Sequence, residues 1–357
     1  MAWHGIFGHD DVVERFRSSL GRDRMASTFL FVGPRGIGKR TFALKLAQAL
    51  LCQERPAARL DPCGACGACV QVVARTHPDL HLVAKPADKS FIPVELFIGP
   101  TEKRMQEGLC HDMALKPFMG GRRVAVIDDA DHFNEAGANC LLKTLEEPPP
   151  RSVMILVGTS AERQLPTIRS RAQIVRFRPL AREIVADLLL ANGVVSDPAE
   201  AARLANYSDG SLEQAAELAD PQLWAFRGQL LNRLSEPLPD TVGLANTLGP
   251  FVDEAGKEAT ARRARARQVI RFAVEFYRHV VRGLCGALPA DDVELQAAVS
   301  VAISTGRWNE SSAAASVERC LEALAHVDRN ANQATLLECW LDDLARIAMN
   351  GQTATSI

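Results

Sequence analysis

A glycine-rich segment near the start of the chain has the spacing of a phosphate-binding loop. Between an apolar run at residues 29–32 and a helical pattern, the sequence reads glycine, four residues, then Gly-Lys. Such glycines let backbone N–H groups converge on phosphate oxygens at a helix N-terminus, and the lysine reaches the β- and γ-phosphates. The candidate nucleotide-binding residues of this segment are Gly33, Gly36, Gly38, Lys39, Arg40 and Thr41.

The segment departs from the complete pattern at one position. A Ser or Thr hydroxyl that binds Mg²⁺ usually follows the lysine. Here Arg40 stands in that place and Thr41 comes one residue late. Because a helix turns by about 100° per residue, Thr41 does not simply replace the hydroxyl. Two interpretations stay open: a loop that binds ATP and Mg²⁺ but hydrolyses poorly, and a loop kept for structure after losing its nucleotide.

A second apolar run, residues 124–127, ends in the carboxylates Asp128 and Asp129. In phosphate-loop proteins the first carboxylate orients Mg²⁺ or its water shell, and the next usually polarises the attacking water. Glu is common at the second position, and Asp129 is one methylene shorter. Since reaction geometry is sensitive to displacements of about 1 Å, we expect weak hydrolysis. The alternative is an acidic loop that caps the next helix.

Four cysteines follow the phosphate-loop pattern: Cys52, then Cys63, Cys66 and Cys69 with two residues between neighbours. Four thiolates form a closed tetrahedral shell for a structural Zn²⁺. The alternatives are an iron–sulfur cluster, a redox pair, or buried small residues. We favour zinc, because a cytosolic setting disfavours disulfides and four thiolates suit this ion.

Strands must position these residues, and the sequence offers five candidates. They are residues 29–32, 80–83, 124–127, 153–157 and 174–177. Helical patterns between them predict a parallel sheet covered by helices on both faces. From about residue 181 onward the chain is rich in Ala, Leu, Arg and Glu, which predicts helices. A proline-containing break at residues 235–240 lies near the start of the last region.

Composition limits the classes of function. A chain of 357 residues suggests two or three domains, and 47% apolar content excludes a disordered chain. With 41 basic and 43 acidic side chains, the protein does not bind nucleic acid through bulk charge. Arginines between residues 262 and 282 do not share one helical face, which favours a solvated helix over a DNA patch. No signal peptide or membrane-spanning run is visible, so we expect a cytoplasmic protein without membrane contact.

Together these features resemble the clamp-loader subunits of bacterial DNA polymerase III, within the AAA+ class. The most specific marks are the cysteine cluster and the stretches at residues 138–149 and 165–172. The resemblance implies a P-loop α/β domain at residues 1–179, with a zinc module at 52–69. It further implies an all-α lid at 180–222 and an all-α collar at 223–350 that assembles a pentamer.

Within this family the chain looks like the delta-prime type. The gamma and tau motors carry a sensor arginine in the lid, where this chain has Glu213, and a carboxylate there would repel a γ-phosphate. Residues 76–81 and 330–334 also look like delta-prime segments. The resemblance implies that Arg171 acts in trans as an arginine finger and that Thr159 is the sensor threonine. A surface arginine in a loop is the alternative for Arg171.

The implied partners are gamma/tau and delta subunits in a hetero-pentamer, the sliding clamp and primed DNA. The chain would help load the clamp as part of DNA polymerase III, being itself no polymerase and a poor ATPase. Two other functions stay open. One is a gamma- or tau-like ATPase motor, favoured by Lys39 and Asp128. The other is a zinc-containing AAA+ nucleotide switch outside replication.

Overall fold

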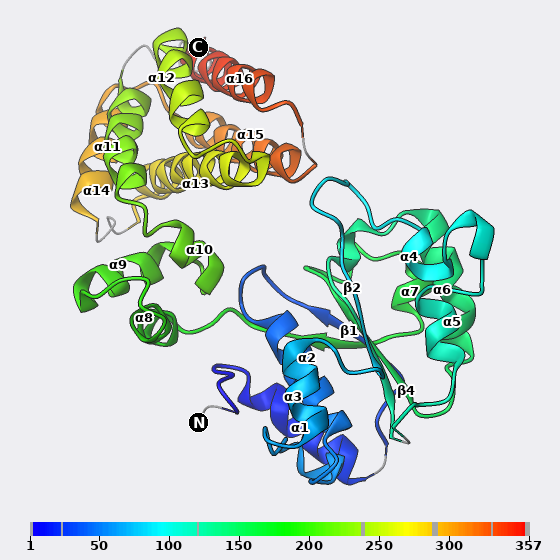
Figure 1. Ribbon diagram of the computed structural model, residues 1–357. Coiled ribbons are helices and arrows are strands. Elements are labelled where there is room, and N and C mark those ends of the chain that lie inside the picture. The colour runs from blue at the N-terminus through cyan, green and yellow to red at the C-terminus, as the bar shows by residue number, and fades with distance from the viewer. Residues whose placement is uncertain are drawn as a thin grey trace. The chain divides into compact units, whose positions relative to one another are not determined.

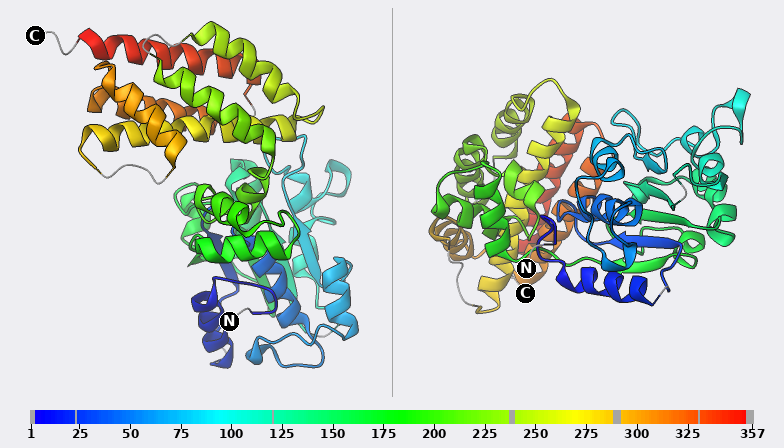
Figure 2. Two further views of the ribbon diagram at one scale, coloured as in Figure 1. Left: turned by 90° about the vertical axis from the view of Figure 1, so that its left-hand side faces the viewer. Right: turned by 60° about the horizontal axis from the view of Figure 1, so that its bottom comes forward.

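The computed structural model describes residues 3–22, 24–119, 121–236, 240–287, 292–329 and 331–353. The chain forms two compact units, Met1–Ala216 and Glu217–Ile357. The first unit combines a β-sheet with helices, and the described residues of the second unit are helical (Figures 1 and 2). Residues 237–239 of the proline-containing break and Asn330 of the segment at 330–334 lie outside the described residues.

All five predicted strands form one parallel sheet. The strands are β1 (Thr28–Val32), β2 (Leu80–Val83), β3 (Arg123–Ile127), β4 (Ser152–Val157) and β5 (Gln173–Arg176). Their order in the sheet is β2-β3-β4-β1-β5, and every neighbouring pair is parallel. The segments that follow β1, β3 and β4 therefore meet at one edge of the sheet, where ligands bind in open α/β folds.

Helices cover both faces of this sheet, as the sequence predicted (Figure 1). On one side lie α1 (Asp10–Gly21), α2 (Lys39–Leu51) and α3 (Gly67–Ala74). On the other side lie α4 (Glu95–Ile98), α5 (Leu109–Ala114), α6 (Glu135–Glu146) and α7 (Pro166–Arg169). Short 3-10 turns occur at Ala57–Arg59 (η1), Thr101–Lys103 (η2) and Ala130–His132 (η3).

Alternate residues of β1, an interior strand of the sheet, build the two cores. Phe31 contacts Phe42 of α2, with ring centroids 5.8 Å apart, and Phe29 contacts Phe16 of α1 at 5.0 Å. Leu30 belongs to the apolar cluster on the opposite face, which includes residues of α4, α5 and α6. Successive strand side chains point to opposite faces, so a continuous apolar strand is the pattern that a doubly covered sheet requires.

Three short helices follow β5 within the first unit. They are α8 (Arg182–Ala191), α9 (Pro198–Tyr207) and α10 (Leu212–Glu217). The carboxylate of Asp197 caps α9 by accepting the N–H of Ala199 and of Glu200, each at 3.2 Å. These helices fall in the range predicted for a lid, and a separate lid domain at 180–222 stays a prediction.

The second unit is a bundle around one long helix. Its helices are α11 (Pro221–Ser235), α12 (Thr241–Asp253), α13 (Ala259–Leu284), α14 (Val293–Ser304), α15 (Glu310–Asp328) and α16 (Gln333–Thr353). Phe272, Phe276 and Val280 of α13 are buried in the bundle, in line with their spacing of four residues. Among the described residues, no helix is long and apolar enough to cross a membrane.

Carboxylates of the second unit engage several arginines of α13. Arg265 pairs with Asp220 at 2.7 Å, and Arg267 pairs with Asp328 at 3.1 Å. These ion pairs neutralise part of the basic stretch, which favours a bundle helix over a DNA-binding face.

Candidate functional site

The phosphate loop joins β1 to α2 in the predicted order. Its three glycines hold backbone conformations that other residues rarely adopt, with φ of 152° at Gly33, 70° at Gly36 and 92° at Gly38. Gly33 donates its N–H to the carbonyl oxygen of Thr159 over 3.0 Å, and a Cβ on Gly33 would lie 2.4 Å from the Phe177 carbonyl oxygen. The loop therefore keeps the tight backbone shape of the motif.

Lys39 is a buried cation at the first position of α2, and it is 7% exposed. Its Nζ donates to the carbonyl oxygen of Gly33 at 2.7 Å and to that of Pro34. Burial lowers the pKa of Lys39 to about 8, against the opposing charges of Asp131 and Asp128. A phosphate beside the ammonium would stabilise its charged form and raise this pKa.

Arg40 and Asp128 form an ion pair across the site. The guanidinium Nε of Arg40 lies 3.3 Å from Oδ2 of Asp128, at the end of β3. The other carboxylate oxygen accepts the backbone N–H of Asp129 at 3.0 Å. Burial and the neighbouring charge of Asp129 raise the pKa of Asp128. Thr41, the next residue along α2, is exposed. The structure thus brings an arginine to the carboxylate that was predicted to orient Mg²⁺.

Thr159 is held by a carboxylate that the sequence analysis did not select. Oδ2 of Asp131 accepts both the backbone N–H of Thr159, at 2.8 Å, and its hydroxyl, at 2.6 Å. Oδ1 of Asp131 accepts the side-chain N–H of Gln164 at 2.7 Å. Asp131 therefore fixes the rotamer of the predicted sensor threonine. Its position two residues after Asp129 in the acidic run was the only available signal.

The segment before and within α10 packs directly on the phosphate loop. Leu212 donates its N–H to the carbonyl oxygen of Gly36 at 3.0 Å. A Cβ on Gly36 would lie 2.2 Å from Oγ of Ser211 and 2.5 Å from Cβ of Glu213. The structure therefore brings Glu213 beside the loop, at the place predicted from the family for a sensor arginine.

The first helix also supports the loop, through a histidine that the sequence did not reveal. His9 is buried, and its Nε2 is hydrogen-bonded to the carbonyl oxygen of Ile37 at 2.8 Å. The His9 ring lies edge-on to Phe177, with centroids 4.9 Å apart. A single histidine before a helix matches no sequence motif, so its contact with Ile37 could be identified only from the fold.

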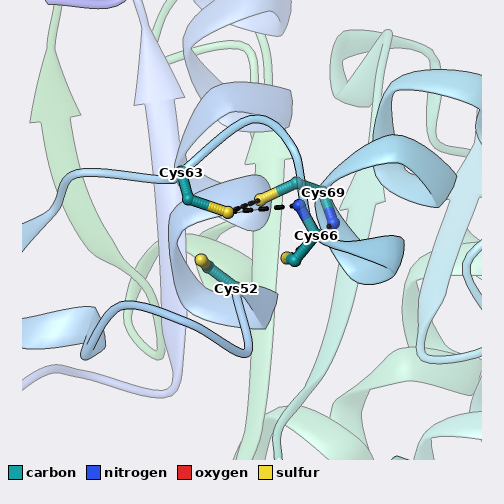
Figure 3. Close-up of side chains that lie close together, drawn as sticks. All are labelled: Cys52, Cys63, Cys66 and Cys69. Carbon is teal, nitrogen blue, oxygen red and sulfur yellow. Dashed lines mark hydrogen bonds between the residues drawn. The ribbon is translucent and has the colours of Figure 1, made fainter.

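The four predicted ligand cysteines come together between the end of α2 and the start of α3 (Figure 3). Their sulfur atoms all lie within 4.8 Å of one another, and those of Cys63 and Cys69 are 3.9 Å apart. With Zn–S bonds of about 2.3 Å, the edge of a tetrahedral site is about 3.8 Å. All four are free thiols. The cluster has the ligands and the spacing that could hold a metal ion.

Backbone N–H groups point at two of these sulfurs. Cys66 donates its N–H to Sγ of Cys63 at 3.3 Å, and Cys69 donates its N–H to Sγ of Cys66 at 3.4 Å. Burial acts to raise the pKa of Cys66, but the N–H groups of Cys69 and Gln53 outweigh it and lower that pKa to about 6. A thiolate is the form that binds metal, so the turn prepares at least one ligand.

Arg171 lies just after α7, on an exposed turn. Its guanidinium contacts Oε1 of Glu146 at 2.5 Å and donates to the carbonyl oxygen of Thr167 at 3.0 Å. Glu146 is the last residue of α6 and is itself exposed. Surface ion pairs contribute little to stability, so this contact positions Arg171 without fixing it permanently. The structure places Arg171 at the surface of the first unit.

Comparisons with known proteins find subunits of DNA polymerase III. The family model described as "DNA polymerase III, delta subunit" matches residues 8–181. The DNA polymerase III subunit delta' of Pseudomonas aeruginosa is 35% identical over 223 residues, which cover 62% of this chain and 64% of that protein. The subunit delta' of Escherichia coli K12 is 31% identical over 239 residues, covering 67% of each chain.

Subunits named gamma/tau are also similar to this chain. The DNA polymerase III subunit gamma/tau of Mycobacterium tuberculosis is 30% identical over 229 residues, covering 61% of this chain and 36% of that protein. The aligned part of the chain therefore spans less than two thirds of the Pseudomonas aeruginosa relative and about a third of the gamma/tau relative.

Proposed function

Because the chain belongs to the family of DNA polymerase III delta' subunits, we propose that it acts as a delta'-like subunit of the clamp loader. In this role it assembles with gamma/tau and delta subunits in a hetero-pentamer and helps load the sliding clamp on primed DNA. It supplies Arg171 to the ATP site of a neighbouring motor, whereas its own phosphate loop hydrolyses ATP poorly. The cysteine cluster binds a structural Zn²⁺.

The exposed position of Arg171 is the observation that carries this proposal. An arginine finger stabilises the charge that develops on a transferring phosphoryl group, and it must reach that group from outside the neighbour's site. Arg171 stands on a surface turn, where it contacts exposed Glu146 and, within its own turn, Thr167 and Ser170. A neighbour's triphosphate can compete for the guanidinium, because it offers more negative charge than one carboxylate.

The chain's own site differs from that of a motor in three places. These differences favour a subunit that assists a neighbouring motor over one that hydrolyses ATP itself. Arg40 replaces the hydroxyl that binds Mg²⁺ and pairs with Asp128. Asp129 holds a left-handed conformation, with φ of 55°, and is shorter than the usual glutamate. Glu213 lies against the phosphate loop, where a carboxylate repels a γ-phosphate. The similarity to gamma/tau subunits keeps a motor as the second candidate function.

The decisive experiment compares Arg171→Ala with Arg169→Ala in the reconstituted assembly. Both arginines are exposed and lie two residues apart, so the variants remove the same charge from the same turn. We expect Arg171→Ala to abolish the share of ATPase activity that comes from the adjacent site, while the subunit composition stays unchanged. Arg169→Ala should retain normal turnover. Unchanged ATPase activity in the Arg171→Ala assembly would refute the finger role.

ATP hydrolysis by the isolated chain separates the two candidate functions. A delta'-like subunit should show no turnover above that of a Lys39→Ala variant, since its site lacks the complete catalytic set. Robust turnover that depends on Lys39 would identify the chain as a motor instead.

A further inference from the structure

Arg40 occupies the position in α2 where a complete phosphate loop carries its Mg²⁺-binding hydroxyl. The guanidinium also pairs with Asp128, the carboxylate that would orient the same ion, at 3.3 Å. Arg40 therefore stands in place of one expected Mg²⁺ ligand, the hydroxyl, and forms an ion pair with the other, Asp128. The pairing links residues 88 positions apart in sequence, so only the folded sheet reveals it.

Of the residues predicted to handle Mg²⁺, Asp128 and Thr41 do not replace the missing hydroxyl. This ion demands near-octahedral oxygen coordination and is strongly repelled by a neighbouring cation. Oδ1 of Asp128 already accepts the N–H of Asp129 at 3.0 Å. The hydroxyl of Thr41 belongs to the next residue of the helix, about 100° further round its axis. The donor set beside the phosphate loop thus does not fit the ion that the fold family implies.

Arg40 and Lys39 together offer an anion two cations, against the single opposing carboxylate of Glu213 beside Gly36. The side chain of Arg40 is 46% exposed, so an anion in solution can reach its guanidinium. A planar guanidinium binds phosphate through two parallel hydrogen bonds, and it cannot lose its proton. Lys39 adds a second cation, which now donates to the carbonyl oxygens of Gly33 and Pro34. Two protein cations flank the loop at the place where one lysine and a metal ion are usual.

We propose that the guanidinium of Arg40 replaces Mg²⁺ at this phosphate loop, so that the loop binds the polyphosphate of a nucleoside di- or triphosphate without a metal ion. A site of this kind binds nucleotide but lacks the ion that activates phosphoryl transfer. The inference extends the proposed function, because it concerns how the chain's own site is used. It does not depend on assembly or on Arg171.

The test is ATP binding by the isolated full-length chain, measured by calorimetry in excess EDTA and in excess MgCl₂. We expect the affinity in EDTA to equal or exceed the affinity in MgCl₂. Arg40→Ser removes the guanidinium and restores a hydroxyl. This variant should bind ATP about tenfold more tightly in MgCl₂ than in EDTA, a difference of about 1.4 kcal/mol. Arg17→Ser, on the exposed face of α1, is the matched control and should behave like the unmodified chain.

Circular dichroism of each variant keeps the result interpretable, because Arg40 and Arg17 are both exposed and neither substitution should disturb the fold. Three outcomes would overturn the proposal. In the first, the unmodified chain binds ATP about tenfold more tightly in MgCl₂ than in EDTA. In the second, it binds no ATP in either buffer. In the third, the Arg40→Ser variant shows the same dependence on MgCl₂ as the unmodified chain. Each would leave the role of Arg171 in the assembly untouched.

Discussion

The two candidate sites of the first unit lie at opposite ends of one helix. Helix α2 begins at Lys39, directly after the phosphate loop, and Cys52 caps its other end. The cysteine cluster keeps a complete set of four ligands in contact range. The phosphate loop keeps its backbone shape but has Arg40 at the position where a complete motif carries a hydroxyl, and Glu213 lies beside the loop.

The difference shows how unevenly two sites can depend on the rest of the fold. The four candidate cysteine ligands come from one stretch, residues 52–69, and a shell of four thiolates would be opened by the loss of any of them. The phosphate loop instead relies on groups from separate strands and helices, such as Asp128, Asp131 and Glu213. Hydrolysis can therefore be lost at a few distant positions while the loop still supports the structure.

The largest expected effect is at the cysteine end of α2. Cys69 is fully buried, and Cys69→Ser removes one of four ligands. We expect metal analysis to find about one zinc per unmodified chain and almost none in the variant, with thermal unfolding at a clearly lower temperature.

Cys285→Ser is the control for this variant, since Cys285 is an exposed cysteine of the second unit. It should retain its zinc and its unfolding temperature. Iron, or no metal, in the unmodified chain would remove the zinc assignment and with it the contrast between the two ends of α2.

A matched pair of glycine variants gives the next largest effect. Gly36 and Gly64 both have positive φ, at 70° and 75°. A Cβ on Gly64 would meet nothing within 4 Å, whereas one on Gly36 would collide with Ser211 and Glu213. Gly64→Ala should cost about 1 kcal/mol of folding free energy for the strained backbone, and Gly36→Ala about 2–4 kcal/mol because a steric clash is added.

Hydrogen exchange locates the effect of the Gly36→Ala variant. The amides of α10 should exchange faster than in the unmodified chain, because the contact of Leu212 with the loop is broken. Gly64→Ala should leave α10 unchanged. Equal protection of α10 in both variants would show that the loop and α10 are not mechanically coupled.

The smallest expected effect is a pH dependence confined to the phosphate loop. Burial lowers the pKa of Lys39 to about 8, so in the free chain the amine is charged below that pH and neutral above it. Nucleotide affinity should therefore be level from about pH 7 to 8 and then fall as pH rises, by up to about tenfold per unit. Phosphate binding raises the pKa of Lys39, and the affinity should stop falling once the pH exceeds that higher pKa.

Calorimetric titrations of ATP across this pH range measure the effect. Lys39→Met removes the titrating amine, so its weaker binding should not change between about pH 7 and 9. An equally steep decline in that variant would assign the pH dependence to another group.

Local patterns predicted much of the fold. The apolar strands at residues 29–32 and 80–83 were identifiable because buried parallel strands are continuous hydrophobic runs. The cysteine spacing indicated that the four thiols meet, because Cys63, Cys66 and Cys69 lie in one tight turn. Asp131 and His9 were not identified as part of the site, since their partners Thr159 and Ile37 are 28 residues away in each case.

The sequence by itself indicated the strands, the phosphate-loop backbone and the four candidate cysteine ligands, because each of these patterns lies within a short part of the chain. Only the tertiary structure decided that Arg40 pairs with Asp128, that Glu213 lies against Gly36, and that Arg171 is presented at the surface. The contacts of Arg40 and Glu213 join separate strands and helices, whose side chains meet only when the parallel sheet brings its carboxyl ends to one edge. The contact of Arg171 with Glu146 lies at the other edge, because these residues precede β5 and β4.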